Sequence, residues 1–149
     1  MTNVTQSTSL GTGIAIDLDS TLVTVGDTVK CVAVASDGSL TATDSDTITI
    51  VNSVPEISSV NITTSSPNNE STVNCMAVAS DADPGDALSY IFTLKRTCAT
   101  INGCTGTTDI VTKTQASGSY TYTLSTSEIQ PDDALICSVA VSDGTVSAT

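Results

Sequence analysis

Short stretches of alternating apolar and polar residues, each closed by a turn sequence, run along most of the chain. Three of them surround a cysteine and begin and end alike: Thr28–Asp37, Thr72–Asp81 and, in weaker form, Ala134–Asp143. Because every second side chain of a strand points to the same face, each copy predicts a half-buried strand that ends in a turn. A repeated cysteine strand is typical of β-sandwich domains in series rather than of an active site.

The chain is predicted to be all-β, because no apolar period of 3.6 residues is sustained. One helical turn is expected near Ser127–Gln130. On one face of the stretch 87–95, Leu88, Tyr90 and Phe92 alternate with polar residues and continue to Leu94, and this face is predicted to be the densest part of a core. The expected strands are residues 2–8, 12–18, 27–36, 39–51, 57–64, 71–80, 87–95, 108–114, 119–125, 134–142 and 145–149.

Two of the three cysteine strands form a closer pair. Cys31 and Cys137 are both followed by Ser-Asp-Gly, which predicts a tight hairpin, whereas Cys75 leads into a longer acidic turn. Cys31 and Cys137 lie 106 positions apart, and at this offset residues 14–43 match residues 120–149 in pattern. An Ig-like sandwich takes about 100 residues. The period therefore corresponds to one domain with its connector.

The phase of this period predicts the domain organisation. Residues 1–51 match the C-terminal part of an Ig-like domain, residues 52–56 form a linker, and residues 57–149 match a domain that lacks most of its last strand. The chain is then a window from a longer array of repeats. The alternative is a complete protein whose unfinished parts are filled by strands from neighbouring copies.

Charge excludes two classes of partner. The formal net charge is −12, and Lys and Arg together number four. Nucleic acids and anionic membranes both require clustered basic residues, so neither is expected as a ligand. The sequence also has no apolar run of membrane-spanning length. An acidic excess favours solubility, low self-adhesion or cation binding.

Five cysteines in a polar chain indicate an oxidising, extracellular compartment. In a sandwich, Cys75 and Cys137 take the positions of a disulfide between the sheets. Closing the loop between them stabilises the fold by roughly 4 kcal/mol. Cys98 and Cys104 are placed to staple a loop, and Cys31 is left without a partner in the sequence. The alternative is that all five are reduced and buried.

The phrase Thr-Val-x-Cys-x-Ala-Val-Ala-Ser-Asp-Ala-Asp-x-Gly-Asp, the hairpin Ser-Asp-Gly-Ser-Leu-Thr-Ala-Thr-Asp-Ser and the connector Ile-Thr-Ile-Val-Asn-Ser-Val-Pro resemble tandem bacterial Ig-like repeats of giant secreted surface proteins. In outline they are also similar to polycystic-kidney-disease and cadherin-like modules. The resemblance covers nearly all of residues 12–149 and implies Greek-key sandwiches joined to further copies in the same polypeptide. The chain departs from it at Cys98 and Cys104, and in having Leu94 where tryptophan is common.

No catalytic group is evident, because the chain has no histidine and no nucleophile with an activating partner. The best small-ligand candidate is calcium at Asp81, Asp83 and Asp86. These residues offer three carboxylates in a short turn, although calcium takes six to eight oxygens. The alternative is a solvated acidic turn, since turn aspartates bond their own backbone.

Three functions follow as expectations. The first is a non-catalytic repeat of a secreted fibre, surface stalk or adhesin shaft, with self-assembly into a filament. The second is a binding module for a cell-surface or matrix ligand, acting through the stapled loop 96–107, with Thr97, Ile101 and Asn102 as candidate contacts. The third is an accessory domain of a secreted hydrolase.

Overall fold

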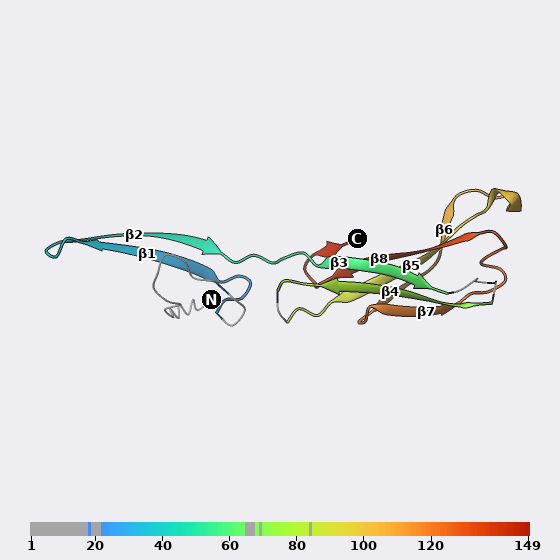
Figure 1. Ribbon diagram of the computed structural model, residues 1–149, viewed down its shortest axis with the longest axis horizontal. Coiled ribbons are helices and arrows are strands. Elements are labelled where there is room, and N and C mark those ends of the chain that lie inside the picture. Colours follow the sequence, from blue (N-terminus) through green and yellow to red (C-terminus); the bar gives the residue numbers. More distant parts are fainter. Residues whose placement is uncertain (1–17, 19–21, 65–67, 69, 84) are drawn as a thin grey trace, which may run out of the picture. The chain divides into compact units, whose positions relative to one another are not determined.

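The computed structural model describes residues 18, 22–64, 68, 70–83 and 85–149 (Figure 1). The chain divides into two compact units, residues 1–52 and 53–149. The described residues form antiparallel β-sheets, and their only helical element is a 3₁₀ turn, η1 (Thr100–Asn102). The all-β class predicted from the alternating pattern is confirmed. The expected strand 2–8 and all but the last residue of 12–18 lie outside the described residues.

The described part of the first unit is a two-stranded hairpin (Figure 1). Strand β1 (Thr28–Ser36) pairs with β2 (Thr41–Thr49), from Thr28 opposite Thr49 to Ser36 opposite Thr41. Almost every residue of both strands is exposed to solvent. The hairpin therefore has no hydrophobic core within the described residues, and local turn chemistry accounts for its shape.

The second unit has two antiparallel sheets that pack around a shared core, as in a β-sandwich. The strand order is β3-β4-β7 in one sheet and β6-β5-β8-β9 in the other. The strands are β3 (Glu56–Thr63), β4 (Thr72–Ser80), β5 (Ser89–Thr97), β6 (Thr107–Gln115), β7 (Ser119–Thr123), β8 (Ala134–Ser142) and β9 (Ser147–Ala148).

The core is built on the alternating face of β5. Phe92 is 0% exposed and Leu94 1%, and Tyr90 stacks on Phe92 with ring centroids 6.2 Å apart. Val73 of β4, in the opposing sheet, and Val141 of β8, beside β5 in the same sheet, belong to this core and are also fully buried. Burying a side chain of this size is worth about 1.5–3 kcal/mol, so each of these side chains contributes appreciably to the stability of a sandwich with few aromatic residues.

A covalent link joins the two sheets at the centre of this core. Cys75 of β4 is bonded to Cys137 of β8, with Cα atoms 6.0 Å apart, within the usual range for a disulfide. A second disulfide joins Cys98 to Cys104, with Cα atoms 5.9 Å apart. Cys31 is the free cysteine and is exposed on β1.

Differences from the sequence-based prediction concern the ends of elements. The stretch expected at 145–149 forms only the two-residue strand β9, which pairs with Val141 and Ser142. The helical turn expected near Ser127–Gln130 is not a helix but a single hydrogen-bonded turn, in which Glu128 N donates to Ser125 O over 3.0 Å. Residues 100–102 were not expected to be helical, because three residues are too few to show a period.

Candidate functional site

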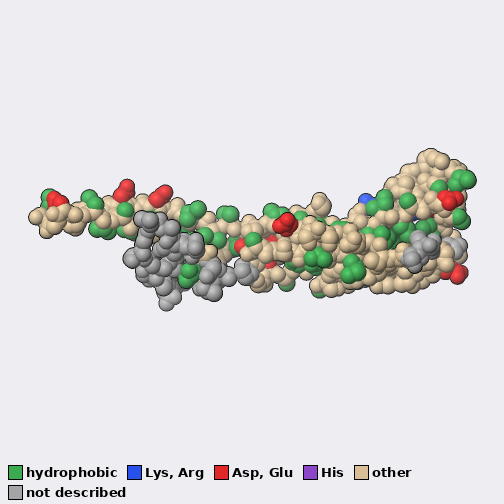
Figure 2. Space-filling model, viewed as in Figure 1, with side chains coloured by type: hydrophobic (Ala, Val, Ile, Leu, Met, Phe, Trp, Pro, Cys, Tyr) green, Lys and Arg blue, Asp and Glu red, His purple; other side chains and the backbone are tan. Residues whose placement is uncertain are grey.

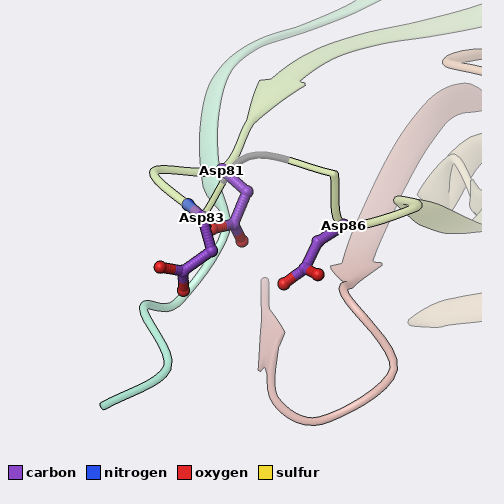
Figure 3. A group of neighbouring side chains, drawn as sticks. All are labelled: Asp81, Asp83 and Asp86. Carbon is purple, nitrogen blue, oxygen red and sulfur yellow. The ribbon is translucent and has the colours of Figure 1, made fainter. Parts of the chain in front are cut away.

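The acidic turn between β4 and β5 brings three carboxylates together. Asp81, Asp83 and Asp86 each offer one oxygen, and these oxygens lie within 4.8 Å of one another (Figure 3). Asp81 and Asp83 are partly buried, whereas Asp86 is exposed. Three such oxygens make up about half of a calcium coordination shell, so backbone carbonyls and water would have to supply the rest.

Hydrogen bonds within the turn give these aspartates a second role. Asp83 N donates to Asp81 Oδ1 over 2.9 Å, and Ser53 N donates to Asp83 Oδ2 over 2.6 Å. Asp83 thus ties the start of the second unit to its own sandwich. The remaining oxygen of Asp81, Oδ2, is buried and accepts no hydrogen bond from the described residues. The turn therefore has a structural function, with the Asp81 oxygen and exposed Asp86 left over for a cation.

The stapled loop lies at the opposite end of β5 from the acidic turn, because it follows Thr97 whereas the turn precedes Ser89. Its base is closed by a hydrogen bond from Cys98 N to Gly106 O of 2.9 Å and by the disulfide to Cys104. The two candidate sites are thus separated by the length of a nine-residue strand, roughly 30 Å.

One buried carboxylate holds the loop on the sandwich. Asp133 has a side chain with no exposed area, and its Oδ1 accepts from Ala99 N at 2.8 Å and Asn102 Nδ2 at 3.0 Å. Its Oδ2 accepts from Gln130 N at 2.9 Å and lies 3.4 Å from Arg96 Nε. These contacts join the loop, the strand β5 and the turn before β8 through a single residue.

The same contacts shift the acidity of Asp133. The hydrogen bond from Ala99 N, then that from Gln130 N, then the Asn102 amide and the Arg96 charge stabilise the ionised carboxylate and lower the pKa of Asp133. Burial opposes this shift without reversing it. The loop is therefore held most firmly when Asp133 is ionised.

The three candidate contacts on the loop differ in their surroundings. Thr97 belongs to β5, and its hydroxyl is 2.9 Å from that of Thr107 on β6. Asn102 donates to Pro131 O at 2.8 Å and to Asp133, so its amide is committed to anchoring the loop. Ile101 is 79% exposed and is the member of the three that projects an apolar side chain to solvent.

Sequence reasoning did not identify Asp133 as a site residue, although a signal was present. Asp133 aligns with Asp27 at the 106-residue offset, so both matching segments have an aspartate at this position. Asp27 makes the same local turn, in which Thr24 N donates to its Oδ2 over 2.9 Å. What the pattern did not reveal is that the second oxygen reaches a loop some thirty positions earlier.

Comparison of the chain with protein-family models, with curated proteins and with solved structures finds no match. Among the residues that the structure describes, no helix has the length and apolar character needed to cross a membrane.

The calcium hypothesis predicts a stability change in the second unit. Calcium at 10 mM should stabilise this unit by roughly 1–3 kcal/mol, given the affinities of extracellular calcium modules. Tyrosine fluorescence during urea unfolding measures this, since Tyr90, Tyr120 and Tyr122 all lie in this unit. Asp86→Asn should abolish the gain and Asp109→Asn should keep it. No gain with the unmodified chain would leave the cluster with its structural role alone.

A second prediction concerns acid. An unfolded Asp has a pKa of about 3.9, and the pKa of folded Asp133 is lower. The stabilisation is therefore complete well above pH 4 and is lost as the pH falls through the folded value. Asp133→Asn should lower the melting temperature by several degrees at pH 7, and by clearly less at pH 2.5. The control is Asp132→Asn, which removes a charge from the adjacent exposed position; an equal loss at both pH values would contradict the prediction.

Proposed function

We propose that this chain is a non-catalytic structural repeat segment of a long secreted or cell-surface fibre, stalk or adhesin shaft. The observation that supports the proposal most directly is the same hairpin built twice. At the 106-residue offset β1 falls on β8, and Ala35 opposite Ala42 in the first hairpin corresponds to Val141 opposite Ala148 in the second. Both hairpins thus have the same register.

The two hairpins also share their turn chemistry. In the first, Ser36 Oγ accepts from Gly38 N at 3.2 Å, while Asp37 Oδ1 accepts from the next two backbone N–H groups at 2.9 and 2.8 Å. In the second, Ser142 and Asp143 accept the equivalent bonds at 3.1, 2.6 and 2.8 Å. Gly38 and its counterpart Gly144 have φ of 92° and 95°, which favours glycine. Duplication in this detail favours a tandem array.

The strand order of the second unit supports an Ig-like identity for the repeat. The sheet β3-β4-β7 corresponds to strands A, B and E of an Ig-like sandwich, and β5 and β8 correspond to C and F. The bridge between Cys75 and Cys137 then joins B to F, as in antibody domains. Leu94 or Phe92 takes the core place of the tryptophan. Together with the motifs, this favours tandem bacterial Ig-like repeats.

A shaft needs connectors that resist bending, and the connector is short. Ile50 N donates to Asp27 O over 2.9 Å and so belongs to the first unit, whereas Ser53 N is bonded to Asp83 in the second. Pro55 is buried in the second unit and has a restricted φ. The anchored positions 50 and 53 are thus only three residues apart along the chain.

The binding-module alternative has one observation in its favour. Ile101 stands 79% exposed at the tip of a loop that a disulfide and Asp133 hold in place. An exposed apolar residue on a rigid loop is the usual form of a protein-binding contact. The loop therefore offers a place where a shaft of such repeats would acquire a ligand.

Electron microscopy of the native material that contains this chain tests the structural proposal. Nine-residue strands span roughly 30 Å, and with the connector a fibre should be beaded at roughly 40 Å. Reduction of the disulfides should disorder this spacing, since it removes roughly 4 kcal/mol from each sandwich. Compact particles without an axial repeat would contradict a role as a shaft.

The loop alternative is tested by Ile101→Asp. If loop 96–107 is the recognition element, this change should abolish adhesion of the native material to its surface while leaving the fibre and the melting temperature unchanged. Deleting the whole loop is a poorer test, because Ala99 and Asn102 contact Asp133 and their loss would destabilise the sandwich. The matched control is Ile91→Asp, a partly exposed isoleucine outside the loop; unchanged adhesion of Ile101→Asp would contradict the alternative.

A further inference from the structure

Equivalent residues in the two hairpins have opposite exposure. On β8, Val139 is 7% exposed and Val141 is 0% exposed, because the opposing sheet β3-β4-β7 packs over this face. At the 106-residue offset they correspond to Ala33 and Ala35 of β1, and both are exposed. Figure 2 shows hydrophobic side chains on the surface along this hairpin. The first hairpin thus presents to solvent the face that the second one buries.

The edge of the first hairpin differs in the same way. β8 is paired on both sides, with β5 on one edge and β9 on the other. Among the described strands β1 pairs only with β2, so no described strand pairs with its second edge. Such an edge is a template for a further antiparallel strand.

Two side chains on this hairpin match side chains that hold the second sandwich together. Cys31 is free and exposed, whereas its counterpart Cys137 is bonded to Cys75. Asp27 is exposed, whereas its counterpart Asp133 accepts two hydrogen bonds from the stapled loop. Among the described residues of the first unit, therefore, none takes the place of the partners that a sheet face, a strand edge, a thiol and a carboxylate have in the second unit.

The turn that contains Asp27 has the same local geometry as the turn that contains Asp133. Its Oδ2 accepts from Thr24 N over 2.9 Å, as the Oδ2 of Asp133 accepts from Gln130 N over 2.9 Å. The preceding residue has a positive φ in both turns, 90° in the first and 69° in the second. The Oδ1 atom of Asp27 is thus positioned like the oxygen of Asp133 that holds the loop.

We propose that the β1–β2 hairpin is a docking surface for a segment homologous to residues 56–115, located earlier in the same polypeptide. This segment adds a β5-like strand along the free edge of β1, covers Ala33 and Ala35, and donates a backbone N–H to Asp27. Ala33 and Ala35 are smaller than Val139 and Val141, the equivalent residues of the second unit. The docking segment therefore carries bulkier side chains opposite these alanines than β4 and β5 carry around the valines.

The docking includes one covalent step. Cys31 Sγ and a cysteine Sγ of the segment form one S–S bond, and each thiol loses its proton. The two electrons pass to a disulfide-bearing oxidant of the oxidising compartment, which is reduced to two thiols. The cysteine of the segment should precede Cys31 by about 62 positions, the separation of Cys75 and Cys137.

The sequence ahead of the hairpin favours a segment of the same polypeptide over a second copy. Leu18 falls on Leu124, which is 3% exposed in the core of the second unit. Further back, Ile14 and Ile16 fall on the two tyrosines of β7. The sequence before the hairpin thus matches the sequence before β8, and the segment that would complete such a repeat corresponds to the strands that precede β7.

Non-reducing disulfide mapping tests this inference. The native polypeptide is treated with iodoacetamide to block free thiols, digested, and its peptides identified by mass spectrometry. The expected result is a peptide of Cys31 linked to one from the same polypeptide that resembles residues 72–80. The peptides of Cys75–Cys137 and Cys98–Cys104 serve as controls for preserved disulfides. Blocked Cys31, or Cys31 linked to a second copy or to another protein, would overturn the proposal.

Hydrogen exchange tests the strand pairing independently of the cysteine. Amides of β1 in the native polypeptide should exchange at least about 100-fold more slowly than in the isolated 149-residue chain. The protection should persist in a Cys31→Ser variant, because edge pairing and apolar cover remain. Equal rates in the two proteins would overturn the proposal. The docking depends on the internal repeat and does not require fibre formation. If microscopy shows no fibres, disulfide mapping and hydrogen exchange still confirm or overturn the docking.

Discussion

Cover of the apolar face of β5 by the opposing sheet is the constraint on which the described second unit depends. Aromatic residues make up only 3% of the chain, and Phe92 is its single phenylalanine. Burial of this ring in the core, together with Val73 of the opposing sheet and Val141 of its own sheet, therefore supplies a large share of the hydrophobic stabilisation. The bridge from Cys75 to Cys137 reduces the entropy of the unfolded chain and compensates for the shortage of large side chains.

Comparison of the two hairpins distinguishes what local interactions determine from what tertiary packing determines. Both have the Ser-Asp-Gly turn, the same register and the same side-chain to backbone hydrogen bonds, although one is exposed and the other is part of a sandwich. Turn chemistry and strand alternation thus suffice to shape the hairpin. Burial of its alternate face requires strands from elsewhere in the sequence, and a β-hairpin alone is marginally stable in water.

The candidate sites show how far residue type alone can be interpreted. The three aspartates after β4 were predicted to lie together, and their oxygens are within 4.8 Å because they share one short turn. The loop was different. Asn102 is polar and lies near a loop tip, both features of a binding residue, yet its amide is occupied by Asp133 and Pro131. Its partners are about thirty positions away, and no local pattern encodes which way an amide turns.

The sequence by itself determined the all-β class and most positions of the described strands, because alternation and Asp-Gly turns act over a few residues at a time. It also indicated which side of β5 forms the core. Only the tertiary structure decided that Asp133 anchors the stapled loop, that Ile101 alone of the loop candidates is free to contact a ligand, and that Cys31 lies on an uncovered face. Each of these depends on distant strands packing side by side, which sequence spacing does not specify.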